Sequence, residues 1–216
     1  MPVVFRRPAA LVLMGAFLGA NAVAMVFLTW TPTFLVEKFH FRLTSAGLSG
    51  SIFIHLASVV SVPLGGLLAD RFARRWAGGR MLVQALGLLV GAGFVALVGR
   101  TSVVSTLLAA MACFGFCKGL YDSNIFAALY DVIEPRARAS AAGLMNTVGW
   151  SGGALGPLVV GWLARHGRFA TEVENMSEAI AWCGAIYLAG ALALFSALKW
   201  LAPRDAARLR REEMAL

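Results

Sequence analysis

The chain has 216 residues, of which 59% are apolar and 14% charged, and its formal net charge is +8. Its mean hydropathy is +0.76, far from the average of soluble proteins. Such a chain has too little polar surface to cover a water-soluble globule. The composition therefore excludes a soluble globular domain and indicates a membrane protein.

The apolar residues fall into six long stretches that we expect to be membrane-spanning helices. About 20 apolar residues cross a bilayer core, and open sheets are not tolerated in lipid. We therefore predict an all-α fold with spans at 8–36, 44–69, 81–99, 103–133, 139–164 and 178–201. Together they form one transmembrane domain, 1–201, followed by a basic cytoplasmic tail, 202–216.

The distribution of Lys and Arg predicts the orientation, because these residues accumulate on the cytoplasmic side. Thirteen of the 19 lie before residue 8, between 70 and 80, at 136–138 or after 198. Five lie at the opposite ends of the spans, and Lys118 lies within one. We predict that both termini are cytoplasmic and that the membrane is a bacterial inner membrane. The positive charge lies in loops next to lipid, so we expect no nucleic-acid partner.

Several polar side chains fall near the middle of the spans, where they are costly unless they face the bundle interior or a wet cavity. They are Asn21 in the first span, His55 in the second, Lys118 and Asp122 in the fourth, and Asn146 and Trp150 in the fifth. We expect these four helices to line a cavity and the third and sixth to support them from outside. A structural interpretation stays open for His55 as a packing residue and for the asparagines as interhelical hydrogen-bonding groups.

Lys118 and Asp122 form the most informative pair. Residues four apart on a helix lie on one face and can touch, and Tyr121 borders the same face. As a structural ion pair, the two side chains would neutralise each other's charge. As a functional pair, the lysine would attract an anionic group, or the aspartate would carry a coupling proton. Both interpretations are compatible with the sequence.

The loop between the second and third spans contains the most specific motif. Residues 66–75 read GLLADRFARR, which gives the pattern G-x-x-x-D-R-x-A-R-R. Two apolar helices joined by this loop resemble the major facilitator transporters, with Ala73 where that family usually has a second glycine. The motif residues are Gly66, Asp70, Arg71, Arg74 and Arg75. The three arginines also fit a simple role in topology and in contact with lipid phosphate.

Asp70 is expected to need a cationic partner. It lies at the C-terminal end of the second span, where the helix dipole disfavours an anion. Arg136 and Arg138 reach the same membrane face, so we predict that Asp70 pairs with one of them. The resemblance implies that such a latch joins the two halves of the bundle on the cytoplasmic side.

The same resemblance implies two inverted three-helix repeats, which together make one half of a twelve-helix transporter. Residues 45–48 and 141–144 open the second and fifth spans with similar sequences, and both spans end in a Pro-Leu segment, at 63–69 and 157–164. In this family the first, second, fourth and fifth helices of each half line the central cavity. The chain is then expected to need a second six-helix half, either a separate chain or a second copy.

Two assignments of the half remain. Residues 30–35 and 119–146 are similar to the seventh, tenth and eleventh helices of organic-anion, sugar-acid and Spinster-type members, which favours the C-terminal half. The glycine–proline pattern at 143–161 resembles the fifth helix of proton-driven drug antiporters, which would make the chain an N-terminal half. Lys118-Gly119 stands where those antiporters carry an arginine motif, so we expect the C-terminal half.

An enzymatic function is not expected. Gly47-Leu48-Ser49-Gly50 has the form of a rhomboid protease motif. However, His55 lies about 9 Å further along the same helix, outside the hydrogen-bond reach that a serine–histidine pair needs. Cys113 and Cys117 lack the further ligands that a metal site requires. We therefore expect no catalytic residue, no metal and no cofactor.

The sequence thus predicts secondary transport of a small solute, such as an organic anion, by alternating access with a proton or sodium as coupling ion. The expected substrate residues are Asn21, His55, Lys118, Tyr121, Asp122, Asn146 and Trp150. The competing hypothesis is a non-transporting membrane subunit or an inactive remnant.

Overall fold

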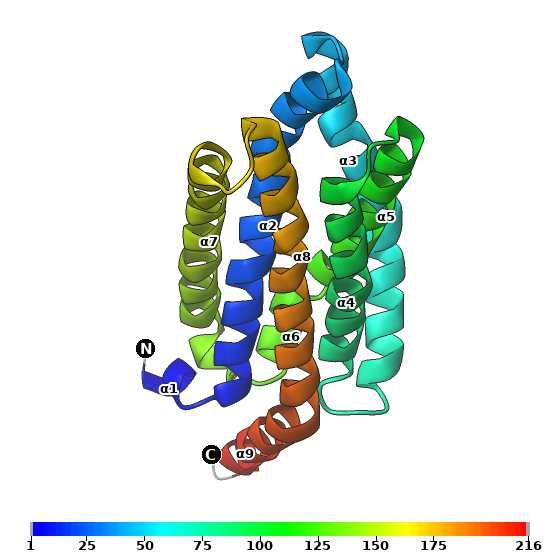
Figure 1. The fold of residues 1–216 in the computed structure, drawn as a ribbon. Helices are drawn as coiled ribbons and strands as arrows, with labels where there is room; N and C mark the ends of the chain where they lie inside the picture. The colour runs from blue at the N-terminus through cyan, green and yellow to red at the C-terminus, as the bar shows by residue number, and fades with distance from the viewer. Residues whose placement is uncertain (1, 215–216) are drawn as a thin grey trace.

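The computed structural model describes residues 2–214 as a bundle of long helices (Figure 1). The long helices are α2 (Pro8–Phe39), α3 (Leu43–Ala73), α4 (Gly79–Arg100), α5 (Val104–Asp122), α7 (Arg138–His166) and α8 (Glu172–Ser196). The shorter ones are α1 (Pro2–Phe5), α6 (Ile125–Tyr130), the 3₁₀ turn η1 (Pro135–Ala137), the π-helical turn η2 (Ala197–Leu201) and α9 (Ala202–Met214). No strand occurs within residues 2–214, so the all-α expectation is confirmed.

Most of the long helices are suited to a bilayer. Within the described part of the chain, five segments are long and apolar enough to cross one: α2, α3, α4, Val104–Tyr130 and Glu172–Leu209. The remaining predicted span corresponds to α7, which has 29 residues. Its six glycines and its short polar side chains make it less apolar than the others. It packs along α2 and also contacts α8, so it belongs to the bundle although it is less apolar than the other long helices.

The helix packing has a two-fold pattern. The most extensive pairings are α4 with α8, α2 with α7, and α3 with α5. In chain order of the six long helices these are third with sixth, first with fifth, and second with fourth. Exchanging the first three helices with the last three converts the α2–α7 pairing into the α3–α5 pairing and leaves the α4–α8 pairing as it is. This is the arrangement that two inverted three-helix units predict.

Glycines allow these pairs to approach closely. A Cβ on Gly115 of α5 would overlap the backbone of Ile54 in α3, and one on Gly152 of α7 would overlap the backbone of Leu18 in α2. In lipid, the hydrophobic effect does not drive helices together, so their association depends on close packing. Small residues allow that packing because they let two helix backbones approach each other. The glycine pattern on α7 is therefore a packing surface for α2.

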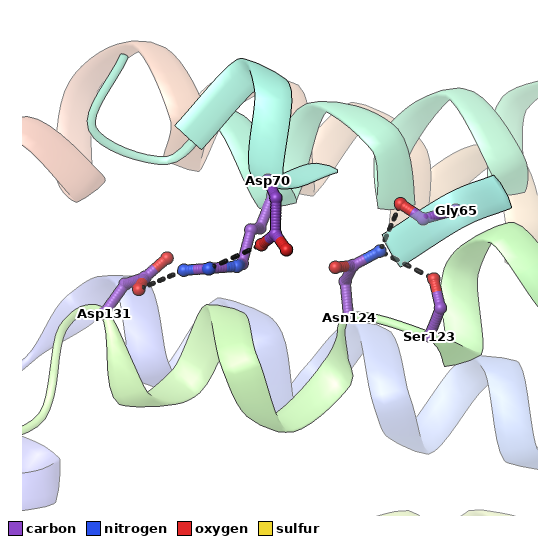
Figure 2. Close-up of polar contacts among 6 residues, drawn as sticks. Gly65, Asp70, Ser123, Asn124 and Asp131 are labelled. Atoms are coloured by element: carbon purple, nitrogen blue, oxygen red, sulfur yellow. Dashed lines mark hydrogen bonds and ion pairs between the residues drawn. The ribbon is translucent and has the colours of Figure 1, made fainter. Parts of the chain in front are cut away.

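The predicted span 103–133 is divided in the structure. Helix α5 ends at Asp122 and α6 begins at Ile125, with Ser123 and Asn124 between them. The side chain of Asn124 donates from Nδ2 to the carbonyl oxygen of Gly65 in α3, at 3.1 Å (Figure 2). Asparagine side chains that bond to backbone groups compete with the helical pattern. The break thus lies where α5 and α3 cross.

The two chain ends meet at one end of the bundle, the end that also carries the α3–α4 loop (Figure 1). The tail predicted at 202–216 folds as α9 over 202–214, and its last two residues lie outside the described residues. The inward face of α9 buries Ala202, Asp205 and Leu209. Asp205 Oδ2 accepts a 2.9 Å hydrogen bond from the backbone N–H of Ala9, in the first turn of α2. Arg7, at the N-cap position of α2, makes no side-chain capping bond. Asp205 therefore caps α2 from the opposite end of the chain.

Candidate functional site

A single cleft brings together four of the seven predicted substrate residues. Its volume is about 200 Å³, and four helices form it: α2, α3, α5 and α7. Its predicted members are Asn21, His55, Lys118 and Trp150. Its other lining residues are Ala24, Met25, Phe27, Leu28, Ser51, Ile54 and Phe114. The helices that the mid-span polar residues singled out are the ones that form the cleft.

The cation of the cleft is Lys118. Its ammonium donates to Asp122 Oδ2 one turn further along α5, in an ion pair within one helix. The two side chains are 24% and 32% exposed. This partial exposure keeps both charges accessible, which lowers the cost of holding them at membrane depth. Lys118 lines the cleft, whereas Asp122 lies behind it as the counter-charge.

Asn21 contributes a hydrogen-bond donor that the fold does not use. Its Nδ2 atom is buried and has no hydrogen-bond partner within the described residues. The amide is held against α7, where a Cβ on Gly149 would lie 2.8 Å from Nδ2. A buried donor left unsatisfied costs about 1–3 kcal/mol. A ligand that accepts this hydrogen bond would recover that cost.

Aromatic rings and an imidazole complete the walls. Phe27 and Phe114 stack with their ring centroids 4.5 Å apart, which joins α2 to α5 beneath the cleft. Trp150 of α7 is 59% exposed, so the face of its indole is open to the cleft. His55 of α3 is also exposed and faces the same space. The site therefore combines one cation, one free amide donor, one imidazole and an open aromatic surface.

The structure corrects the position of Tyr121 and separates Asn146 from the cleft. Tyr121 is 1% exposed and belongs to the bundle core. One residue before Asp122, it is turned by about 100° around the helix axis, away from the face of the ion pair. Asn146 is exposed on α7, one turn before Trp150. It thus shares the open side of Trp150 without lining the cleft.

At the end of the bundle that carries the α3–α4 loop, Asp70 pairs with Arg80 and not with Arg136 or Arg138 as expected. Arg80 Nη2 lies 2.8 Å from Asp70 Oδ1, and Arg80 Nη1 lies 2.6 Å from Asp131 Oδ1 (Figure 2). The sequence motif showed the membrane face of Asp70, but it did not show which of several arginines there lies nearest. Arg80 follows the short α3–α4 loop directly, which places it between the two carboxylates.

The two arginines predicted to pair with Asp70 make other contacts or are exposed. Arg138 donates from Nη2 to the carbonyl oxygen of Tyr130, at 3.1 Å, and lies over the Tyr130 ring. Arg136 is exposed in η1. A link between the two three-helix units nevertheless exists, because Asp131 follows α6 whereas Asp70 and Arg80 belong to α3 and α4. Asp131, an acid near the C-terminal end of the predicted fourth span, was the signal that sequence reasoning missed.

The other motif residues are open to the surroundings. Arg71, Arg74 and Arg75 are all exposed. A Cβ on Gly66 would meet no atom of the described chain within 4 Å. Within the described residues, the motif therefore contributes the Asp70 carboxylate, which pairs with Arg80, and three exposed arginines.

The comparisons with known proteins agree with this architecture. The chain is 26% identical over 192 residues to the hexuronate transporter of Bacillus subtilis (strain 168), covering 85% of this chain and 42% of that protein. It is 30% identical over 180 residues to the D-galactonate transporter of Escherichia coli O6:H1, covering 81% of this chain and 41% of that protein. The chain thus spans less than half the length of these relatives, which are named as transporters and not as enzymes.

A solved structure shows the same fold. The crystal structure of a bacterial homologue of the human lysosomal transporter Spinster, inward-facing and occupied, superposes with a TM-score of 0.75 at 15% identity. The match covers 92% of this chain and 50% of that one. Residues 12–215 also match the family model of the Major Facilitator Superfamily. The chain is therefore an integral membrane protein that belongs to the Major Facilitator Superfamily and has the fold of one of its halves.

Proposed function

We propose that this chain is the C-terminal half of a secondary transporter that moves a small organic anion by alternating access. The observation that carries the proposal is the position of Lys118, a partly exposed cation in a cleft formed by α2, α3, α5 and α7. A cation kept at membrane depth is expensive and therefore points to a function on the substrate pathway.

The chemistry of the cleft suits a sugar acid or a related hydroxy acid. The substrate carboxylate would accept from the Lys118 ammonium, and a further oxygen would accept from the unpartnered amide of Asn21. The indole of Trp150 would pack against the C–H face of a sugar chain or ring. Hexuronate and galactonate, named for two relatives, are molecules of this kind.

The ion pair supplies a route for coupling. A substrate carboxylate that takes over Lys118 would leave Asp122 without its cation, and Asp122 would then carry the coupling ion. Asp122 is thus the proposed coupling site, with a proton preferred over sodium. His55, exposed on the facing wall of the cleft, is the second candidate for a proton.

The open side of the bundle favours a second six-helix half. On α3, Leu56, Val59 and Leu67 are 61%, 70% and 71% exposed. Glycines on α3 and α7, Gly66 and Gly143, leave open space where a Cβ would stand. The chain also spans only 42% and 41% of two relatives. We infer that another six-helix unit closes the cleft, with both termini cytoplasmic in a bacterial inner membrane.

Uptake of radiolabelled D-galactonate and hexuronate into vesicles containing the chain tests the proposal. We expect uptake that Lys118→Gln abolishes, while the control Lys199→Gln, an exposed lysine outside the cleft, leaves it unchanged. Vesicles should be prepared with the chain alone and with any six-helix protein encoded beside it. Absence of both uptake and binding under both conditions would instead favour a non-transporting subunit.

A further inference from the structure

Two adjoining cavities lie on the α7–α8 side of the bundle, near the end opposite the chain termini. One is a groove of about 360 Å³ between α2, α7 and α8 whose lining is apolar throughout. The other is a pocket of about 310 Å³ around the α7–α8 loop, lined in part by Arg168, Asn175 and Glu178. Leu163, Ala179 and Trp182 line both cavities. The surface therefore passes continuously from a polar pocket to an apolar groove.

The polar pocket is a built structure. Asn175, which is 7% exposed, donates from Nδ2 to the carbonyl oxygens of Ala164 and Phe169, at 3.2 Å each. Its Oδ1 accepts from the backbone N–H of Phe169 at 2.9 Å. A Cβ on Gly167 would overlap the same amide group. One buried amide thus fixes the loop that carries Arg168.

The pocket presents both signs of charge. The Arg168 side chain is 75% exposed, and its Nη2 lies 3.4 Å from Glu178 Oε1. Glu178 Oε1 also accepts a 2.9 Å hydrogen bond from the indole of Trp182. The guanidinium therefore remains open to an external anion, while the carboxylate is held in place by the indole. Trp182 lies one turn beyond Glu178 in α8, and tryptophan is enriched at the bilayer interface.

The groove is distinct from the substrate cleft. On α2 it uses Leu18, Ala22 and Val26, whereas the cleft uses Asn21, Met25 and neighbouring residues. The mean directions of the two sets lie about 130° apart around the α2 axis at 100° per residue. On α7 the exposed groove residues are Leu155 and Val159, on a different face from Trp150.

We propose that these two cavities bind one glycerophospholipid with a phosphoethanolamine headgroup. The acyl chain lies in the apolar groove between α2, α7 and α8. The lipid phosphate accepts from Arg168, and the ammonium of the headgroup donates to Glu178. A choline headgroup has no N–H to donate to Glu178, and a glycerol headgroup carries no positive charge. The paired charges at the interface therefore select a headgroup that carries both a phosphate and a primary ammonium.

The experiment is photo-crosslinking of the purified full chain in mixed micelles. The probe is phosphatidylethanolamine with a diazirine in its acyl chain, and the labelled residues are mapped by mass spectrometry. We expect labels within 152–163 and 179–186. Arg168→Gln should reduce labelling about tenfold, because a charge-assisted hydrogen bond is lost. The matched control Arg42→Gln removes an exposed arginine of the α2–α3 loop and should leave labelling unchanged.

A second pair of variants tests the groove without touching the headgroup pocket. Val159→Trp fills the groove, and the control Val90→Trp places a side chain of the same size on α4, outside the groove. The two valines are 54% and 52% exposed, so both positions accept a larger side chain. Only Val159→Trp should block labelling.

Competition with unlabelled lipids tests the headgroup. Phosphatidylethanolamine should displace the probe more effectively than phosphatidylcholine or phosphatidylglycerol, and Glu178→Gln should remove that preference. The proposal is overturned if labels fall outside the groove, if Arg168→Gln behaves like Arg42→Gln, if Val159→Trp labels as Val90→Trp does, or if all three lipids compete equally. Labelling that disappears when a second six-helix half is bound would show that the groove is a protein interface.

Discussion

Replacing Arg80 by glutamine would remove the bridge between the two three-helix units beside the α3–α4 loop. Arg80 is 24% exposed and bonds to Asp131 at 2.6 Å and to Asp70 at 2.8 Å. Asp131 is 33% exposed and Asp70 is 59% exposed. Because solvent screens the second pair more strongly, we assign about 1–2 kcal/mol to the Asp131 link and less than about 1 kcal/mol to the Asp70 link.

The free energy of unfolding should therefore fall by about 1–3 kcal/mol in Arg80→Gln. Circular dichroism during unfolding in mixed micelles measures this change. Double-mutant cycles should give a larger coupling energy for Arg80 with Asp131→Asn than for Arg80 with Asp70→Asn. The reasoning is refuted if Asp70→Asn costs as much as Asp131→Asn, or if Asp70→Asn couples to Arg138→Gln instead.

Three further predictions test packing, capping and the site. Gly115→Ala should lower the free energy of unfolding by about 1–3 kcal/mol, because a Cβ there meets the α3 backbone. The control Gly143→Ala lies in open space and should cost nothing. Equal effects of the two variants would contradict the close packing of α5 against α3. Asp205→Ala removes the acceptor of the Ala9 N–H, so it should cost about 1 kcal/mol and speed proteolysis of α9. Arg208→Gln is the exposed control, and unchanged proteolysis in Asp205→Ala would exclude the cap. Asn21→Leu should leave thermal stability unchanged or higher, since its Nδ2 has no partner in the described chain, yet abolish anion binding; retained binding would exclude Asn21 as a ligand donor.

The cleft could be predicted from sequence because lipid makes polar side chains expensive. Asn21, His55, Lys118 and Trp150 were recognised by their depth in apolar spans, and the structure brings them together. Depth along a helix can be counted from the sequence. The two-fold pairing of the helices was likewise expected from the repeated segments and is present in the packing.

Features that depend on direction around a helix or on close neighbours could not be predicted in this way. Tyr121 lies at the same depth as Asp122 but points into the core. The choice of Arg80 as the partner of Asp70 depends on the conformation of a short loop. The break after Asp122 depends on a hydrogen bond from Asn124 to another helix. None of these is encoded in a local pattern.

The account rests on Lys118 as the group that recognises a negative charge. Equilibrium binding of D-galactonate and of its uncharged analogue galactitol to the purified protein tests this most directly, in the wild type, Lys118→Gln and Lys199→Gln. The account predicts that the wild type and Lys199→Gln prefer the anion by about tenfold or more, as expected for a charge-assisted contact, and that Lys118→Gln loses this preference. An undiminished preference for galactonate in Lys118→Gln would contradict it.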